Sequence, residues 1–325
     1  MAADALSDVL RSVRLTGAAF FHVDIEGAWA AETAAVKDYI PYVMPGVEHL
    51  FEYHFIVAGR CWAAVAGEPA IRIEQGDIIV FPQGDAHVMS SSPGMRGHPD
   101  MSQLEDANST QLPLPFFRRE RGKGDPVQLI CGFLGCDVRP FNPIMAALPK
   151  LIKVSERLGQ EDSWLGEFMR IATTESKLKR PGGESVLSRL SELMFVEVLR
   201  RYISSLTDSQ TGWLGGLRDR FVGAALNLLH GDPSHQWTVD ELAMKVGLSR
   251  SALGERFTQL IGHSPMQYLT SWRIQTAARA LANGADNIAD VAARAGYGSE
   301  AAFSRAFKRV TGIAPAKYRS ARRSA

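Results

Sequence analysis

Four side chains in the first half of the chain are of types that bind transition-metal ions. Cys131 and Cys136 are thiols five residues apart, and His54 and His87 occur earlier in the chain. A spacing of five places two side chains on opposite faces of a regular strand, but the glycines between the cysteines could let the chain turn and bring both sulfurs together. If both histidines point inward nearby, these two imidazoles and two thiolates predict a tetrahedral zinc site.

The same residues also fit other roles. A zinc ion there could be structural, or the thiolates could form an oxidant-sensitive switch that loses metal or forms a disulfide. Alternatively, Cys131 and Cys136 are small buried apolar residues, and His87 is a turn histidine with satisfied hydrogen bonds. The site could instead hold an organic ligand against an apolar lining, with the candidates Phe51, Phe55 and Trp62.

The elements that must position these residues are short β-strands. From residue 1 to about 140, apolar runs are separated by Gly, Pro and Asp, which predicts an all-β sandwich or barrel. The predicted strands are 18–23, 52–57, 61–65, 71–73, 78–81 and 128–133. Residues 90–125 lack apolar periodicity and predict an unusually long loop, either a disordered insertion or a lid.

One motif in this β-rich stretch resembles a known family. The spacing G-x5-P-x-G-x2-H from Gly76 to His87 is similar to the second conserved motif of cupins, in which the histidine faces the barrel interior. The first cupin motif is poorly kept, because Ile56 stands where H-x-H would place a second histidine after His54, and no glutamate follows at the family's spacing. The resemblance implies a cupin-like barrel and argues against the standard site of three histidines and one glutamate.

Between residues 141 and 206 the apolar period becomes helical. Asn142-Pro143 predicts the cap and first turn of a helix that continues to Val154, with an end or kink at Pro149. A longer helix over 184–206 places its apolar side chains along one stripe. The stripe of this segment fits either packing on the chain's own barrel or the interface of a dimer.

The region 217–325 contains one pattern twice, after a predicted flexible linker over 207–216. Each copy predicts a helix-turn-helix: a capped first helix, a glycine in the left-handed conformation, a tight turn and a second amphipathic helix. A predicted helix over 266–282 joins the copies. The pairs Ala243 and Ala292, Gly247 and Gly296, Phe257 and Phe307, and Tyr268 and Tyr318 match at an offset of 49 or 50.

This duplicated pattern resembles the DNA-binding domain of the AraC/XylS family of bacterial transcription regulators, over about a third of the chain. The second copy matches most of the family's signature, namely Ile288, Ala292, Gly296, Tyr297, Phe303, Arg305, Phe307, Lys308, Gly312, Pro315, Tyr318 and Arg319. The resemblance implies two recognition helices, the second helix of each copy, in successive major grooves. Cupin-like sensor domains are common in this family, so the resemblance also fits the β-rich first part.

The outward positions of the two recognition helices are the predicted DNA contacts. In the first helix they are Arg250, Ser251, Gly254, Glu255 and Thr258. In the second they are Ser299, Glu300, Ala301, Ser304 and Arg305. Glu255 can accept a hydrogen bond from cytosine, whereas Arg305 is either a base or phosphate contact or a structural pairing residue. The predicted phosphate contacts are Lys308, Arg309, Lys317 and Arg319. Few of these side chains can bind a base bidentately, so we expect DNA shape to contribute to specificity.

The charge distribution agrees with a nucleic-acid partner for the repeats. The whole chain has a formal net charge of +1, but residues 218–325 contain fifteen Lys or Arg and only eight Asp or Glu. This basic end suits contact with phosphates. No apolar run reaches the roughly 18 residues of a membrane span, and three cysteines are too few for a secreted disulfide scaffold. We therefore expect a cytoplasmic protein with no membrane partner.

These observations predict an α+β protein. Its parts are a cupin-like sensor β-barrel (1–140), a helical dimerisation segment (141–206), a flexible linker (207–216) and an all-α double helix-turn-helix domain (217–325). The predicted function is a sequence-specific DNA-binding transcription regulator, in the form of an activator, whose barrel senses a small molecule, metal or oxidant. Expected partners are double-stranded promoter DNA, RNA polymerase and a second copy of the chain. The alternative is a cupin-type metal-dependent enzyme with an appended DNA-binding domain.

Overall fold

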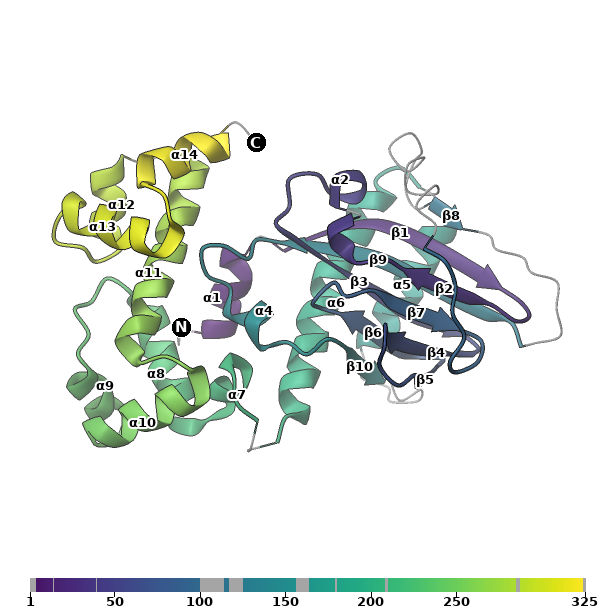
Figure 1. Ribbon diagram of the computed structural model, residues 1–325, viewed down its shortest axis with the longest axis horizontal. Helices are drawn as coiled ribbons and strands as arrows, with labels where there is room; N and C mark the ends of the chain where they lie inside the picture. The colour runs from purple at the N-terminus through teal and green to yellow at the C-terminus, as the bar shows by residue number, and fades with distance from the viewer. Residues whose placement is uncertain are drawn as a thin grey trace. The chain divides into compact units, whose positions relative to one another are not determined.

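The structure is a computed structural model in which the chain forms two compact units. One, the barrel unit, comprises Leu15–Asp137 and Leu148–Ser204, and the other, the helical unit, comprises Met1–Arg14, Val138–Ala147 and Ser205–Ala325. The described residues are 4–13, 15–38, 40–99, 114–116, 125–155, 164–178, 180–207, 210–284 and 287–323. The described strands of both sheets lie in the barrel unit, and the described elements of the other unit are helices, which confirms the predicted α+β class (Figure 1).

The barrel unit contains two β-sheets around one apolar core. The larger sheet is built from β1 (Thr16–Ile25), β3 (His49–Ala58), β6 (Asp77–Phe81), β8 (Leu114–Phe116), β9 (Val127–Cys136) and β10 (Ile152–Ser155), in the order β10-β6-β3-β9-β1-β8. The smaller sheet is built from β2 (Ala30–Thr33), β4 (Arg60–Val65), β5 (Ile71–Glu74) and β7 (His87–Ser90), in the order β2-β7-β4-β5. Side chains from both sheets, among them Ile56, Ile73 and Leu129, meet in the core.

All six predicted strands are present. They lie within β1, β3, β4, β5, β6 and β9, and both β3 and β9 are longer than predicted, at ten residues each. The predicted long loop over 90–125 falls mostly outside the described residues. Within that range, residues 114–116 form β8, which pairs parallel with β1.

The helix predicted from Asn142 to Val154 is wrong in its second half. Helix α4 (Pro143–Ala147) ends before Pro149, and β10 then pairs antiparallel with β6. In β10 buried and exposed residues alternate, which is the two-residue period of a strand. Two apolar residues such as Ile152 and Val154 were too few to separate a strand from a helix.

Two helices, α5 (Trp164–Leu178) and α6 (Gly183–Ser205), belong to the barrel unit and cover the larger sheet (Figure 1). On β3, the ring of Phe51 lies 4.7 Å from that of Phe195, and the Tyr53 hydroxyl lies 2.7 Å from Ser191 Oγ. Since successive side chains of a strand alternate between faces, the even-numbered residues of β3 point into the barrel. The predicted stripe of α6 is largely buried in this interface, through Leu187, Met194 and Val198.

The helical unit contains the two predicted helix-turn-helix motifs. They are α9 (Val239–Val246) with α10 (Arg250–Ile261), and α12 (Ile288–Arg294) with α13 (Glu300–Thr311). Helix α11 (Pro265–Asn283) joins them as predicted (Figure 1). The remaining helices are α1 (Ala5–Ser12), α4, α7 (Trp213–Arg218), α8 (Arg220–Gly231) and α14 (Pro315–Arg323). Among the described residues, no helix is long and apolar enough to cross a membrane.

Local signals in the sequence determine where the recognition helices α10 and α13 begin. Ser249 and Ser299 each cap a recognition helix by accepting a hydrogen bond from a backbone N–H of its first turn. Gly247 ends α9 in the left-handed conformation, at φ 79°, which glycine adopts without steric cost. The buried aromatic side chains are Phe257 in α10 and Phe303 and Phe307 in α13, and they leave the other side of each helix free.

The predicted flexible linker over 207–216 is shorter in the structure. Trp213 and Leu214 begin α7 and are buried, 3% and 1% exposed. Helix α8 starts at Arg220, because Asp219 is extended and its side chain caps the helix.

Candidate functional site

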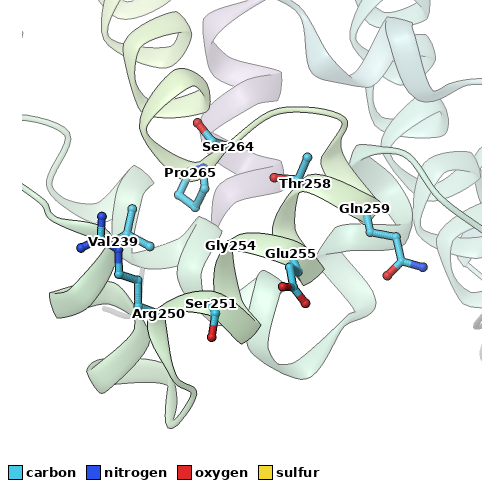
Figure 2. A pocket seen from close by; sticks show the side chains of 9 residues that line it. All are labelled: Val239, Arg250, Ser251, Gly254, Glu255, Thr258, Gln259, Ser264 and Pro265. Carbon is cyan, nitrogen blue, oxygen red and sulfur yellow. The ribbon is translucent and has the colours of Figure 1, made fainter.

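The outer side of α10 presents the predicted DNA contacts to solvent. Arg250, Ser251, Glu255 and Thr258 are exposed, and Gly254 is half-buried between them. These five residues line an open pocket together with Val239, Gln259, Ser264 and Pro265 (Figure 2). Nothing lies within 4 Å of the position that a Cβ would take at Gly254. The middle of this helix is therefore open to close approach by another molecule.

Two arginines of α10 differ in their availability. Arg250 pairs with Asp240 over 2.9 Å, and both side chains are more than 60% exposed, so this pair contributes little stability and can exchange for a phosphate. Arg256 binds both carboxylate oxygens of Asp219, with Nε at 3.0 and 2.9 Å, and Asp219 is only 11% exposed. Arg256 is therefore a structural residue that fastens α10 to the start of α8.

The second recognition helix, α13, has a basic outer surface. The exposed residues are Ser299, Glu300, Ala301, Arg305, Lys308 and Arg309, with Ser304 half-buried, and on α14 Lys317 is exposed and Arg319 half-buried. Within the described part of the chain, Arg305, Lys308, Arg309 and Lys317 make no ion pair. Arg305 therefore has no carboxylate partner for the structural pairing that the sequence left open. All four cations are available to bind phosphates.

Contacts between distant residues hold the two motifs together. Arg273 on α11 donates a 2.7 Å hydrogen bond to the carbonyl of His235 and lies over the ring of Tyr297. Gln236 donates to the carbonyl of Gly296 over 2.8 Å. The loop before the first motif is therefore attached to the turn of the second. Sequence reasoning missed these residues, because the partners are 24 to 60 positions apart and no local pattern links them.

Comparisons with known proteins agree with this geometry. The cupin family model matches residues 4–204, and the helix-turn-helix domain model matches residues 242–321. A Streptomyces antibioticus protein named as an AraC-like transcription regulator is 34% identical over 281 residues, which cover 81% of this chain and 92% of the relative. The chain belongs to the AraC family of transcription regulators. The predicted family, the DNA-binding function and the cupin-like domain are thereby confirmed.

Two further relatives of this AraC-family regulator are similar over most of their length. An AraC-like regulator of Streptomyces lividans is 30% identical, covering 97% of this chain and 98% of the relative. The RCS-specific transcriptional activator RclR of Escherichia coli is 23% identical, covering 83% of this chain and 84% of the relative. These relatives are regulators, so the alternative of a cupin-type enzyme has no support.

The barrel of the AraC-family regulator brings together three of the four predicted metal ligands. His54 Nε2 lies 3.0 Å from His87 Nε2, and His54 Nδ1 lies 2.9 Å from Cys131 Sγ. Cys136 lies away from this cluster, because β9 is one continuous strand. In the pairing of β9 with β3, Cys131 stands opposite His54, whereas Cys136, five residues further on, stands opposite His49. Five residues of extended strand span about 17 Å. The predicted two-histidine, two-cysteine zinc site is therefore not formed.

The fourth member of this buried cluster is Glu52, which sequence reasoning missed. Its carboxylate oxygens lie 3.6 Å from His54 Nε2 and 3.5 Å from His87 Nε2. The cupin motif was expected to supply a glutamate after the histidine, whereas Glu52 precedes His54 by two residues. The signal was present, because two residues apart on a predicted strand means the same face.

Burial sets the protonation of these side chains in the absence of a cation. It raises the pKa of Glu52 to about 8 and lowers the pKa of His87 to about 4. Burial also lowers the pKa of His54 and raises the pKa of Cys131, in each case well away from the usual value. The neutral forms are therefore favoured at pH 7.

The other sequence-based alternatives for the regulator's barrel fit less well. Cys131 and Cys136 are too far apart on β9 for a disulfide, and burial raises the pKa of Cys136 to about 12, so neither thiol is a reactive thiolate. Phe51, predicted to line a ligand pocket, packs against Phe195 of α6. Phe55 shares its face of β3, and Trp62 is half-buried. The predicted aromatic lining is wrong for Phe51, because it lies between sheet and helices.

Proposed function

We propose that this AraC-family regulator binds promoter DNA through α10 and α13, works as a homodimer in the cytoplasm and activates transcription by contacting RNA polymerase. The observation that carries the proposal is the duplicated motif, in which both recognition helices bury one side and expose the other. Arg305, Lys308 and Arg309 supply positive charge on the second helix, as contact with phosphates requires.

The homodimer is supported by apolar side chains that remain in solvent. Of the large hydrophobic residues that are exposed in the described chain, Val186 (41%) and Leu193 (54%) lie on α6, and Trp164 (42%) and Leu178 (57%) lie on α5. Val186 and Leu193 are seven residues apart and therefore share one face of α6. Two large apolar side chains on one exposed helix face are suited to contact with another protein, and a second copy of the chain would bury them.

Activation is proposed on the name of the Escherichia coli relative, which is called a transcriptional activator. Transcription in vitro from a bound promoter, with purified bacterial RNA polymerase, tests this role. We expect transcript yield to rise when the full-length protein is added. A fall in yield would instead identify a repressor.

DNA binding is tested by selecting bound fragments of genomic DNA with the full-length chain and then titrating one selected promoter. We expect Arg305→Ala and Glu255→Ala each to weaken binding about 5- to 150-fold, which corresponds to the roughly 1–3 kcal/mol of a specific base contact. We expect Lys308→Ala to reduce the slope of log K against log salt by about 1. Arg72→Ala is the matched control, because Arg72 is an exposed cation of the barrel unit. Equal affinities for all four variants would overturn the proposed interface.

A further inference from the structure

The interior of the barrel contains a cluster of three metal-binding side chains. Glu52 and His54 are two residues apart on β3, and His87 begins β7 of the other sheet. They are 6%, 4% and 0% exposed. One donor atom from each lies within 4.8 Å of the others. Donor atoms from three side chains therefore converge on one small buried region. Such polar groups are costly to bury unless they are hydrogen-bonded, paired with an opposite charge or bound to a metal ion.

Hydrogen bonds behind the histidines direct their free nitrogens into the cluster. His87 Nδ1 lies 3.1 Å from the carbonyl oxygen of Asp85. A carbonyl oxygen can only accept, so Nδ1 carries the hydrogen and neutral His87 presents an unprotonated Nε2. His54 Nε2 lies 3.0 Å from that nitrogen. This arrangement is the one by which histidine ligands of metals are usually held, with the second nitrogen bonded to a carbonyl or similar group.

One oxygen of the cluster has no hydrogen-bond partner. Among the described residues, Glu52 Oε2 is a buried side-chain oxygen without a hydrogen bond. Its carboxyl group also lies next to two nitrogens rather than next to an arginine or lysine. Leaving a buried carboxyl oxygen unsatisfied is costly, and a bound cation removes the cost.

We propose that Glu52, His54 and His87 bind one divalent first-row transition-metal ion inside the barrel. Two imidazole nitrogens and one carboxylate are the ligands of many zinc and non-haem iron sites, and such three-ligand sites keep a position open for water or a small molecule. The metal site goes beyond the proposed DNA-binding function and does not depend on it, because binding of the ion can be measured without DNA.

Cys131 acts on this site through His54 as a positioning residue. Its sulfur lies 2.9 Å from His54 Nδ1, on the other side of the ring from His87. When the metal is bound by Nε2, Nδ1 carries the hydrogen and donates it to the sulfur, which fixes the orientation of the ring. Loss of such a partner weakens metal binding about 10- to 100-fold.

The side chains of the cluster also form a specific hydrogen-bond pattern among themselves. The Cys131 thiol can donate to His54 Nδ1, His54 Nε2–H can donate to His87 Nε2, and His87 Nδ1–H donates to Asp85. This series of hydrogen bonds gives a partner to both nitrogens of each histidine but leaves Glu52 Oε2 without a hydrogen bond. A protein without the metal site would remain in this state at every metal concentration.

The test measures metal in the full-length chain, purified without chelators or a nickel column, by mass spectrometry and then by titration of the stripped protein with Zn²⁺. We expect about one ion per chain. Glu52→Gln and His87→Gln should lower the affinity more than any other variant, with circular dichroism showing that each is folded. Cys131→Ala should weaken binding about 10- to 100-fold, and Cys131→Ser, which keeps an acceptor for Nδ1, should restore it.

Cys136→Ala is the matched control, because Cys136 is a buried thiol on the same strand but stands opposite His49. We expect it to bind metal as the unchanged chain does. The Co²⁺-loaded protein should show d–d absorption without a thiolate-to-metal charge-transfer band. Failure of the folded, stripped chain to bind Zn²⁺, or equal loss of metal from Cys136→Ala and Glu52→Gln, would overturn the site. Neither result would change the expected DNA affinity of Arg305→Ala, so the two proposals fail separately.

Discussion

The indole N–H of Trp213 donates a 2.7 Å hydrogen bond to the hydroxyl oxygen of Tyr268 in the core of the helical unit. Both side chains are nearly inaccessible, at 3% and 1% exposed, and His230 Nε2 lies 2.8 Å from the same oxygen. The bond attaches α7, which lies largely in the segment predicted as a linker, to the helix that joins the two DNA-binding motifs.

Replacing Tyr268 with Phe should destabilise the helical unit. The change removes the hydroxyl and leaves the buried Trp213 N–H without its acceptor, which costs about 1–3 kcal/mol. Urea unfolding followed by circular dichroism measures the loss. Tyr42→Phe is the control, because Tyr42 is 37% exposed and its change should stay within about 0.5 kcal/mol. Equal effects of the two variants would mean that the bond contributes nothing.

The matched glycines of the two turns should tolerate alanine differently. Gly247 and Gly296 have φ of 79° and 77°, so alanine at either position adopts a left-handed conformation at a cost of about 1–2 kcal/mol. At Gly296 the added Cβ would also lie 2.6 Å from the backbone oxygen of Ser234, whereas at Gly247 it meets nothing within 4 Å. We expect Gly296→Ala to lower the free energy of unfolding clearly more than Gly247→Ala. The same urea measurement compares them, and the reverse order would contradict the close approach seen here.

The ion pair between Asp219 and Arg256 should make the stability of the helical unit depend on pH. Burial acts to raise the pKa of Asp219, but the hydrogen bonds from Arg256 and from two backbone N–H groups outweigh it and hold the pKa below 3.8. A carboxylate whose pKa is lowered by folding stabilises the fold at pH values above its pKa in the unfolded state. This contribution is lost as the pH falls through the pKa of the folded state, which lies below 3.8.

Asp219→Asn keeps the helix cap and removes the charge. We expect it to cost about 1 kcal/mol at neutral pH, and the difference from the unchanged chain should shrink as the pH falls below about 4, which is near the unfolded pKa of an aspartate. Unfolding by urea at a series of pH values measures this. Asp240→Asn is the control, because its pair with Arg250 is exposed on both sides. A constant difference at all pH values would show that the charge is not the cause.

A glutamate at Leu193 should separate the proposed homodimer. Leu193 is 54% exposed on α6, so the monomer tolerates a charge there, whereas an apolar interface between two copies does not. Sedimentation velocity should show a dimer for the unchanged chain and a monomer for Leu193→Glu. Met244→Glu changes an exposed hydrophobic residue of α9 instead (73% exposed) and should leave the dimer intact. A dimer in both variants would place the interface elsewhere.

Helices α1 and α4 belong to the helical unit, although they fall in segments that were predicted as barrel and as dimerisation segment. The two helix-turn-helix motifs, in contrast, could be predicted almost completely from the amino-acid sequence. Each signal there is local: Ser249 and Ser299 cap the helices that follow them, Gly247 ends α9, and Phe257 repeats as Phe307. A helix forms hydrogen bonds within a few residues, and the motif occurs twice, so the pattern was readable without knowledge of distant contacts. The positions of most strands were readable for the same reason, because their alternation and the turns between them are local.

The tertiary structure alone decided which side chains meet. Pairing of β3 with β9 places Cys131 beside His54 and leaves Cys136 opposite His49, and packing of the two sheets brings His87 onto Glu52. Strand register and sheet packing join residues that are tens of positions apart, and a shift of one residue in register would turn every side chain to the other face. The buried cluster therefore contains Glu52 and lacks Cys136, whereas His54, His87 and Cys131 lie together as the sequence suggested.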